Sequence, residues 1–421
     1  MEKILQALKE EKINEYLIVE ETVYGKEWFC IGKKLDMSRA KKVKHFYLTV
    51  YQTIYECNER YKGSASCKLS EAWDIKRIQE RICDLVKEAS YVKNPYYELP
   101  SPSSDIDGKA SSSLGTIQGV FDVMADFHED EDIALNSYEL FESMTEVRIV
   151  NSKGVDVTYS YPSHELEVII NAKNEDHEIE IYQDIHFGEP NIAELKHQLG
   201  KATRQAKDRV KAEPLKQQHI CQRVIISQEN VLSIFRYYLF QLRVDALYQQ
   251  YSTVAIGDKL GPADFHLEGL PYLEHSSMNF AYDREGRPCR QVTLVDKGQV
   301  QNFWGDHIFS GYTDNLDTTM VYNFKIAPGS ITLEMMRSEP YLEIVQFSDF
   351  SCHPITGDFN GEIRLGYYFD GEKKVVISGG SVSGNIKDSE KTMVLSKELS
   401  KYNNAVVPSA ILLEKVRIAC E

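Results

Sequence analysis

Apolar residues along the chain follow two spacings, and these spacings predict where strands and helices lie. Over residues 45–55, apolar and aromatic side chains alternate with a period of two, which is typical of a strand. Over residues 75–89, apolar side chains recur every three or four positions, which predicts a helix packed on that sheet. Further helices are expected over residues 1–14, 117–143, 192–210 and 229–249, and further strands over residues 16–20, 27–31, 146–151, 156–161, 166–172, 178–185 and 222–227.

The texture of the sequence changes twice and suggests three parts. Pro, Ser and Gly dominate residues 94–115, which predicts a connector. After Tyr251 the chain reads as short strands with frequent Gly and Asn or Asp turns. We therefore expect an N-terminal α/β domain (1–105), a central α+β segment (106–220) and a β-rich C-terminal domain (221–421). The expected class is α+β, with helices covering the N-terminal sheet. The C-terminal half should be mostly antiparallel and barrel-like, because many short strands need their edges covered.

The charge distribution argues against nucleic acid as a direct partner. The formal charge is −16, and no Lys or Arg lies between Lys109 and Arg148, a stretch that holds nine acidic residues from Asp122 onward. Affinity for a phosphate backbone normally rests on clustered Lys and Arg. A solvated helix face or loop is the simpler interpretation of the acidic stretch.

Cysteine usage and the N-terminus indicate a reduced, cytoplasmic protein. The eight cysteines are scattered and form no CxxC pair. The first twelve residues form an amphipathic helix pattern without the apolar core of a signal peptide. No apolar stretch approaches the roughly 20 residues that span a bilayer, so we expect free thiols and no membrane partner.

A series of glycine-centred motifs marks the last third of the chain. In order, they are Asp283-Arg-Glu-Gly286, Lys297-Gly298, Ala327-Pro-Gly-Ser330, Thr356-Gly-Asp-Phe359 and Gly379-Gly-Ser-Val-Ser-Gly-Asn385. Each motif is, in the first place, typical of a tight turn, because Gly accepts a positive φ and the side chain of Asp or Asn forms hydrogen bonds with nearby backbone amides. Their order and spacing resemble the C-terminal domain of the TldD/TldE (PmbA) proteins, metalloproteases also described as modulators of DNA gyrase. The segment Glu146–Asp156 and the ending Val407–Glu414 resemble the family as well.

The zinc motif of the TldD half of the family is missing. That half carries His-Glu-x-x-x-His on a helix, where two imidazoles one turn apart hold the ion and the Glu acts as base. The matching helix here, residues 229–249, contains no His, and residues 384–408 contain neither Cys nor His. His164-Glu165 and His177-Glu178 begin the motif without completing it, and we expect both pairs at the surface of edge strands. The resemblance therefore implies a TldE-like chain with no metal site, and zinc on a TldD-like partner.

Residues in and beside the motifs are candidates for an internal cleft. The resemblance suggests that these turns line a cleft that takes an extended peptide, which fits strand addition to a sheet edge. No residue is assigned a catalytic or a metal-binding role. The candidate cleft residues are Cys352, His353, Asp358, Asp283, Asn323, Gly380 and Asn385.

Three functions are compatible with this sequence. The first is a TldE/PmbA-like subunit that pairs with a TldD-like protease, acts on small or unfolded peptides, and forms a homodimer when alone. The second is a self-sufficient hydrolase with an unorthodox site near Cys352, His353 and Asp358. The third is a non-enzymatic peptide-binding protein linked to gyrase or toxin modulation. Whether the chain is an enzyme by itself stays open at this stage.

Overall fold

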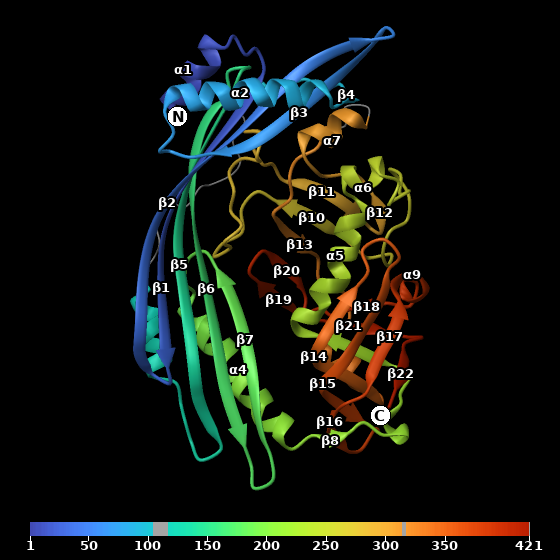
Figure 1. Cartoon of the computed structure of the whole chain (residues 1–421). Coiled ribbons are helices and arrows are strands. Elements are labelled where there is room, and N and C mark those ends of the chain that lie inside the picture. Colours follow the sequence, from blue (N-terminus) through green and yellow to red (C-terminus); the bar gives the residue numbers. More distant parts are fainter. Residues whose placement is uncertain (104–116, 314–316, 421) are drawn as a thin grey trace.

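The computed structural model describes residues 1–103, 117–313 and 317–420. A tall seven-stranded antiparallel sheet stands beside a C-terminal part built on two further sheets (Figure 1). The order of the tall sheet is β4-β3-β2-β1-β5-β6-β7. Its strands are β1 (Tyr16–Ile31), β2 (Lys34–Glu56), β3 (Glu59–Leu69), β4 (Asn94–Pro95), β5 (Ile133–Asn151), β6 (Asp156–Lys173) and β7 (Glu178–Phe187).

One strand pair joins the first and the central parts of the chain into this sheet. Strand β1 pairs with β5 without interruption from Leu17 opposite Asn151 to Ile31 opposite Ser137. The turn expected over residues 151–154 is present and connects β5 to β6. The predicted domain boundary near residue 105 therefore divides the sequence but not the sheet, and the three-domain division stays a prediction.

Four helices cover one face of the tall sheet. They are α1 (Glu2–Glu10), α2 (Ile75–Ser90), α3 (Gln118–Ala125) and α4 (Ile192–Val210). Helices α1 and α2 pack on Ile18 and Leu48, and α3 and α4 pack on Leu140 and Leu166. Side chains alternate across a strand, so the odd-numbered residues of β6, and those of β5 from Ser137 onward, point to the opposite, helix-free face. Before the register shift at Ser137 the order is reversed, and Ile133 and Leu135 lie on the helix side. The sequence predicted α2 and α4 because their apolar stripes repeat with helical spacing.

The C-terminal part contains a six-stranded and a nine-stranded sheet. The six-stranded order is β12-β11-β10-β13-β20-β19, and the main path of the other is β18-β21-β9-β14-β15-β16-β8, with β17 and β22 beside β15. The strands are β8 (Glu213–Pro214), β9 (Val224–Ser227), β10 (Leu267–Leu270), β11 (Val292–Asp296), β12 (Gln299–Val300), β13 (Asn323–Ile326), β14 (Tyr341–Cys352), β15 (Asp358–Phe369), β16 (Lys374–Ser378), β17 (Ser381–Asn385), β18 (Val394–Leu395), β19 (Leu399–Tyr402), β20 (Ala405–Pro408), β21 (Ala410–Leu413) and β22 (Arg417–Ala419).

A buried helix lies between these two sheets and forms the main C-terminal core with them. Helix α5 (Val231–Gln241) places Phe235 and Tyr238 among residues of both sheets, including Leu267 of β10 and Leu342 of β14. The short helices of this part are η1 (Gln217–His219), η2 (Gln228–Asn230), α5 (Val231–Gln241), α6 (Val244–Tyr248), α7 (His307–Tyr312), α8 (Leu333–Met336) and α9 (Ile386–Ser389). The chain passes from β20 of one sheet to β21 of the other through Ser409 alone.

The α+β class and the β-rich C-terminal half are confirmed, and three details of the prediction are wrong. The two C-terminal sheets are open and, within the described residues, neither closes into a barrel, because α5 fills the space between them. Residues 117–143 are not one helix, since β5 begins at Ile133, where buried and exposed side chains alternate. The helix expected over residues 229–249 is divided into η2, α5 and α6, with a break at Leu242 and Arg243.

Two further expectations from the sequence concern the connector and membrane-spanning segments, and the structure tests them only over the described residues. The connector expected over residues 94–115 lies partly outside it, since residues 104–116 are not described. No helix among the described residues is both long and apolar enough to cross a membrane.

A glycine in β3 sets how closely α2 packs on the sheet. A Cβ atom at Gly63 would lie 1.9 Å from the carbonyl oxygen of Ala89 and 2.7 Å from that of Val92. We therefore expect Gly63→Ala to destabilise the protein by about 1–3 kcal/mol, because backbone must move to make room. Thermal unfolding followed by circular dichroism measures this.

The control for this prediction is Gly200→Ala in the middle of α4. There the nearest atom to a new Cβ is the Arg204 Nη1 at 3.7 Å. Ala is favoured over Gly inside a helix by roughly 0.5–1 kcal/mol, so this variant should unfold at or above the wild-type midpoint. Equal midpoints for the two variants would contradict the packing argument.

Candidate functional site

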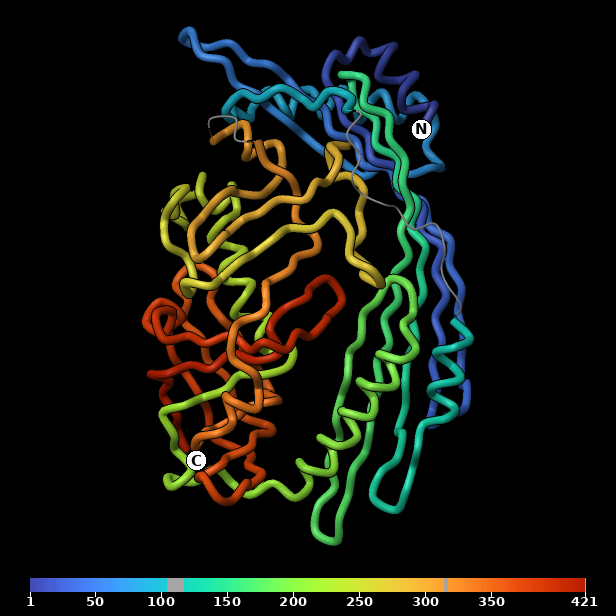
Figure 2. The backbone as a smooth tube through the Cα atoms, turned by 180° about the vertical axis from the view of Figure 1, so that it is seen from behind, coloured from blue at the N-terminus to red at the C-terminus, as the bar shows by residue number. Residues whose placement is uncertain are grey.

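Two strands that end their sheets line one shared cavity. Strand β7 is the last strand of the tall sheet, and β19 is the last strand of the six-stranded sheet. Residues 182–185 of β7 and residues 399–402 of β19 both line a cavity of about 610 Å3. In Figure 2 the red β19–β20 hairpin reaches from the C-terminal part toward the green strands of the tall sheet. Helix α4, η2 and the middle of β14 complete the wall.

The wall of this cavity combines half-buried lysines with carboxylates and apolar groups. The pKa values of Lys201 and Lys401 are lowered, in both cases first by burial, while Glu194 raises each of them. Glu229 also lines the wall and favours the charged form of Lys201. The apolar side of the wall includes Tyr182, Phe347, Leu399 and Tyr402. Such a wall suits a ligand that carries both polar main-chain groups and side chains of mixed character.

A tight contact joins the tall sheet to the C-terminal part at one end of this region. The Gly188 N–H donates to the carbonyl oxygen of His275 at 2.7 Å. A Cβ at Gly188 would lie 2.4 Å from the carbonyl oxygen of Ser276, so only Gly fits. His275 and the end of β7 also line a smaller cavity that adjoins the first.

The expected surface position of His164 is wrong. Its side chain is fully buried, stacks on Phe187 at 5.1 Å between ring centroids, and bonds the Gly188 carbonyl oxygen through Nδ1 at 2.5 Å. Burial lowers the pKa of its imidazole. Strand β6 lies between β5 and β7 and is not an edge strand, which the sequence alone did not reveal. His177 lies in the exposed turn before β7, as expected.

Four of the predicted cleft residues come together at one turn. Asn385 Nδ2 donates to Asp358 Oδ1 at 2.7 Å, and Thr356 Oγ1 donates to Asp358 Oδ2 at 2.7 Å. These two bonds, that of Asn385 first, lower the pKa of Asp358. The His353 Nδ1 accepts from the Thr356 N–H at 3.2 Å, and Cys352 precedes it at the end of β14. Asn385 also caps α9 by accepting from the Lys387 N–H.

The chemistry of this turn does not favour a thiol nucleophile. Burial, followed by Asp358, raises the pKa of the Cys352 thiol to about 12. The thiolate is the reactive form of cysteine, so it is scarce here at neutral pH. The Cys352 Sγ lies 3.9 Å from the Gly357 carbonyl oxygen, which gives it no activating base.

Asp283 belongs to a separate buried cluster beneath the tall sheet. Its carboxylate accepts from the Arg287 Nε at 2.8 Å and from the N–H groups of Glu285 and Arg287. The nearby Glu285 is buried, and among the described residues no hydrogen bond of ordinary geometry reaches its carboxyl oxygens, although the His307 amide faces it. Burial, followed by the charge of Asp283, raises the pKa of Glu285 to about 8. The turn also places Gly286, at φ +84°, against Val155 of the tall sheet.

Asn323 and Gly380 occupy two further places. Asn323 is fully buried, accepts from the Ser276 Oγ at 2.6 Å and donates to the Met278 carbonyl oxygen, which fixes a loop. Gly380 has φ +73° and lies between β16 and β17, which both pair with β15. The glycine pair at 379–380 therefore lies on one side of β15, between two strands that both pair with it.

The predicted residues thus fall into four places, and none of them lines the cavity between β7 and β19. The residues that do line it, such as Lys201, Glu229 and Lys401, carried no motif in the sequence. The available signal was the alternation along β7, which identified a strand but not its position at the end of the sheet.

Comparisons with known proteins identify the family. The central domain model of the PmbA/TldA metallopeptidases matches residues 116–212, and the C-terminal domain model matches residues 221–420. Together these ranges cover well over half of the chain, which therefore belongs to the PmbA/TldA (TldD/TldE) family.

The fold is shared with solved members of this group. TldE from Thermococcus kodakarensis superposes with a TM-score of 0.78 at 16% identity, over 99% of this chain and 100% of that one. A candidate modulator of a DNA gyrase from Thermotoga maritima gives a TM-score of 0.79 at 13% identity, over 99% of both chains. An uncharacterized protein of Methanocaldococcus jannaschii is 24% identical over 162 residues. That match spans 34% of this chain and 38% of the relative, well under half of its length.

Helix α5, which the sequence comparison led us to expect at the place of the family's zinc helix, carries no side chain that binds zinc. Helix α5 is lined by Val, Leu, Phe and Tyr side chains and offers no imidazole to a metal. Zinc in a metalloprotease needs His, Cys or carboxylate donors on one face. We therefore derive no catalytic step through a metal on this helix.

The buried Glu285 should make stability depend on pH. In the unfolded chain its pKa returns to about 4.5, whereas in the folded protein it is about 8. The folded state then holds the proton more tightly, so stability is complete below pH 4.5 and falls as the pH rises toward 8. One proton corresponds to a slope of up to about 1.4 kcal/mol per pH unit.

Glu285→Gln keeps the shape of the side chain and removes its ionisation. We expect this variant to be more stable than the wild type at pH 8 and to lose that part of the slope. Denaturant unfolding at several pH values measures it. The exposed Glu175→Gln serves as control and should keep the wild-type slope; an unchanged slope in Glu285→Gln would refute the assignment.

Proposed function

We propose that this chain is a TldE/PmbA-like subunit of a TldD/TldE-type peptidase and that it holds extended peptide segments between β7 and β19. The observation that carries the proposal is that two sheet-end strands line a single cavity. The natural ligands are small or unfolded peptides, because a folded protein cannot offer a free strand. Zinc and the hydrolytic step belong to a TldD-like partner.

Strand addition explains how such a cavity recognises a peptide. The last strand of a sheet presents unpaired N–H and C=O groups to its open side. A peptide that adds to β7 or β19 pairs with these groups through its main chain, while its alternate side chains enter the flanking pockets. The same geometry would serve peptides of many sequences, as a subunit for unfolded substrates requires.

The charges of the wall support a peptide rather than a purely apolar ligand. Lys201 and Lys401 are partly dehydrated, so they attract a carboxylate more strongly than solvated lysines do. Glu194 and Glu229 on the same wall suit a peptide amine or a basic side chain. These paired signs favour a zwitterionic peptide.

The missing zinc ligands support a division of labour between two chains. Neither α5 nor residues 384–408 provide the donor set of the family's protease half. The chain would complete the cleft and hold substrate, while the partner supplies the metal. By analogy with such a heterodimer, the chain forms a homodimer through its C-terminal half when the partner is absent.

Leu399→Asp tests the binding cavity. Leu399 is 39% exposed and lines the wall. A carboxylate at this position must be desolvated when a peptide binds, so we expect the dissociation constant for a dye-labelled pool of random decapeptides to rise more than about tenfold, or 1.4 kcal/mol. Fluorescence anisotropy measures it.

The matched control is Leu35→Asp, which changes a leucine that is 57% exposed on β2. This variant should bind the peptides as the wild type does. Equal weakening in both variants, or in neither, would remove the cavity from the proposal while leaving the family assignment intact.

The partner hypothesis predicts activity only in the pair. The purified chain should cleave a quenched fluorescent peptide no faster than buffer, and addition of a TldD-like protein should produce cleavage that chelators abolish. Size-exclusion chromatography with light scattering reports whether the two chains associate. Chelator-sensitive cleavage by this chain alone would overturn the assignment.

A further inference from the structure

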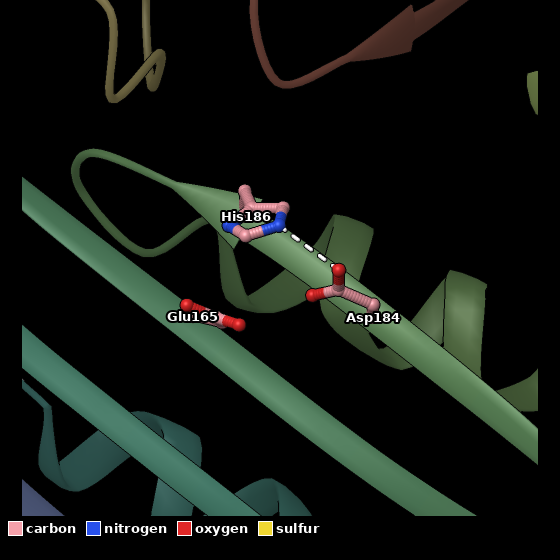
Figure 3. A group of neighbouring side chains, drawn as sticks. All are labelled: Glu165, Asp184 and His186. Atoms are coloured by element: carbon pink, nitrogen blue, oxygen red, sulfur yellow. Dashed lines mark hydrogen bonds and ion pairs between the residues drawn. The ribbon is translucent and has the colours of Figure 1, made fainter.

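The helix-free face of the tall sheet carries three side chains of the kinds that bind metals, Glu165, Asp184 and His186. They lie near Gly188, where the sheet contacts the C-terminal part. Glu165 on β6 lies directly opposite His186 on β7 in the strand register, and Asp184 is two residues before His186. All three therefore point to the face opposite α4. Figure 3 shows them above the same surface of the two strands.

The three side chains are close enough to share one ion. One ligand atom from each of Glu165, Asp184 and His186 lies within 4.8 Å of the other two. The His186 Nε2 and the Asp184 Oδ2 are already 3.0 Å apart. Small side-chain rotations bring such atoms to the roughly 2.0–2.2 Å that zinc requires. Because the backbones belong to paired strands, the set is held on a rigid support.

Like charges on the neighbouring strands give a second, independent reason for a cation. Glu139 on β5 lies opposite Glu167 on β6, and Glu167 lies opposite Asp184 on β7, which makes a row of three carboxylates across the sheet. Directly opposed like charges destabilise a sheet. Among the described residues, no Lys or Arg lies within 4.0 Å of Glu165, Glu167 or Asp184. A divalent cation beside this row would offset the repulsion.

We propose that Glu165, Asp184 and His186 form a binding site for a divalent transition-metal cation, of which Zn2+ is the best match. One imidazole nitrogen and two carboxylate oxygens are a donor set that zinc accepts, and three protein ligands leave a position for water or for a ligand atom. The site lies on the central part of the chain, away from α5. It does not depend on the proposed peptide-binding role.

The proposed metal site lies next to both cavities, so a ligand in either cavity could reach the coordination position that the protein leaves open. Asp184 lines the 610 Å3 cavity, and His186 lines the smaller cavity beside it. A bound cation would therefore sit at the rim of the region where β7 and β19 approach a common space. A carboxylate from a ligand in that space could complete the coordination.

A second histidine between two carboxylates provides a control within the same chain. His266 Nδ1 lies 3.0 Å from Asp296 Oδ1, and its Nε2 lies 3.6 Å from Glu268 Oε1. The two carboxylates thus engage opposite sides of one ring and cannot share an ion with it. Removing Glu268 should leave cation binding unchanged.

The test is a zinc titration of the full chain after removal of metals by a chelator. Zn2+ alone is added in competition with a chromogenic indicator, and stoichiometry is checked by elemental analysis after dialysis. We expect Glu165→Gln and His186→Ala to lose one bound zinc per chain or to bind it more than about tenfold more weakly. Glu268→Gln should bind as the wild type does.

Cobalt(II) distinguishes this site from the scattered thiols. Cobalt bound by nitrogen and oxygen shows weak visible bands without the strong near-ultraviolet absorption of a thiolate complex. We expect such a spectrum in the wild type and in Glu268→Gln, and its loss in His186→Ala, with circular dichroism unchanged throughout. Identical zinc stoichiometry in all variants, or a spectrum of thiolate type alone, would overturn the proposal.

Discussion

The pairing of β1 with β5 is the constraint on which the rest of the molecule depends. It is continuous from Leu17 to Ile31 and fixes the register of two segments more than 100 residues apart. A shift by one residue would exchange the two faces of the sheet. The helices would then lose their contact with Leu140. The C-terminal part would lose its contact with Ile149, which packs in one cluster with Ile308 and Tyr312 of that part. This register also fixes where β6 and β7 lie, and with them the cavity and the group formed by Glu165, Asp184 and His186.

The C-terminal part meets the tall sheet through two close approaches at glycine residues and through an apolar cluster in which Ile149 packs with Ile308 and Tyr312. Gly286 contacts Val155 at one level, and Gly188 bonds the His275 backbone at another. Between these contacts the opposing surfaces are lined by tyrosine rings, such as Tyr161 against Phe280 at 4.6 Å. Beyond Gly188 the surfaces separate, and the cavity between β7 and β19 occupies that space. Of these two glycines, Gly188 lies against backbone and Gly286 lies against a side chain.

Much of the local structure could be predicted from the sequence, but the site could not. Periodicity identified α2, α4 and most strands of the tall sheet because each buries one regular stripe. It failed over residues 117–143, where we predicted one helix although the buried residues Ile133, Leu135 and Tyr138 belong to strand β5. It could not show which strands end a sheet, because strand order depends on contacts between distant segments. The sequence therefore did not show that Asp184 and His186 on β7 lie beside Glu165 on β6.

The single residue between β20 and β21 has a mechanical consequence. Because Ser409 alone separates a strand of the six-stranded sheet from one of the nine-stranded sheet, the two sheets share a covalent corner with no slack. Helix α5 packs on both sheets as well, so the two sheets are joined by a common core in addition to the chain. The corner therefore fixes the position of β19, which pairs with β20, relative to β14, which is joined to β21 through β9. Both β19 and β14 line the cavity, so these two parts of its wall are held at one spacing by the corner.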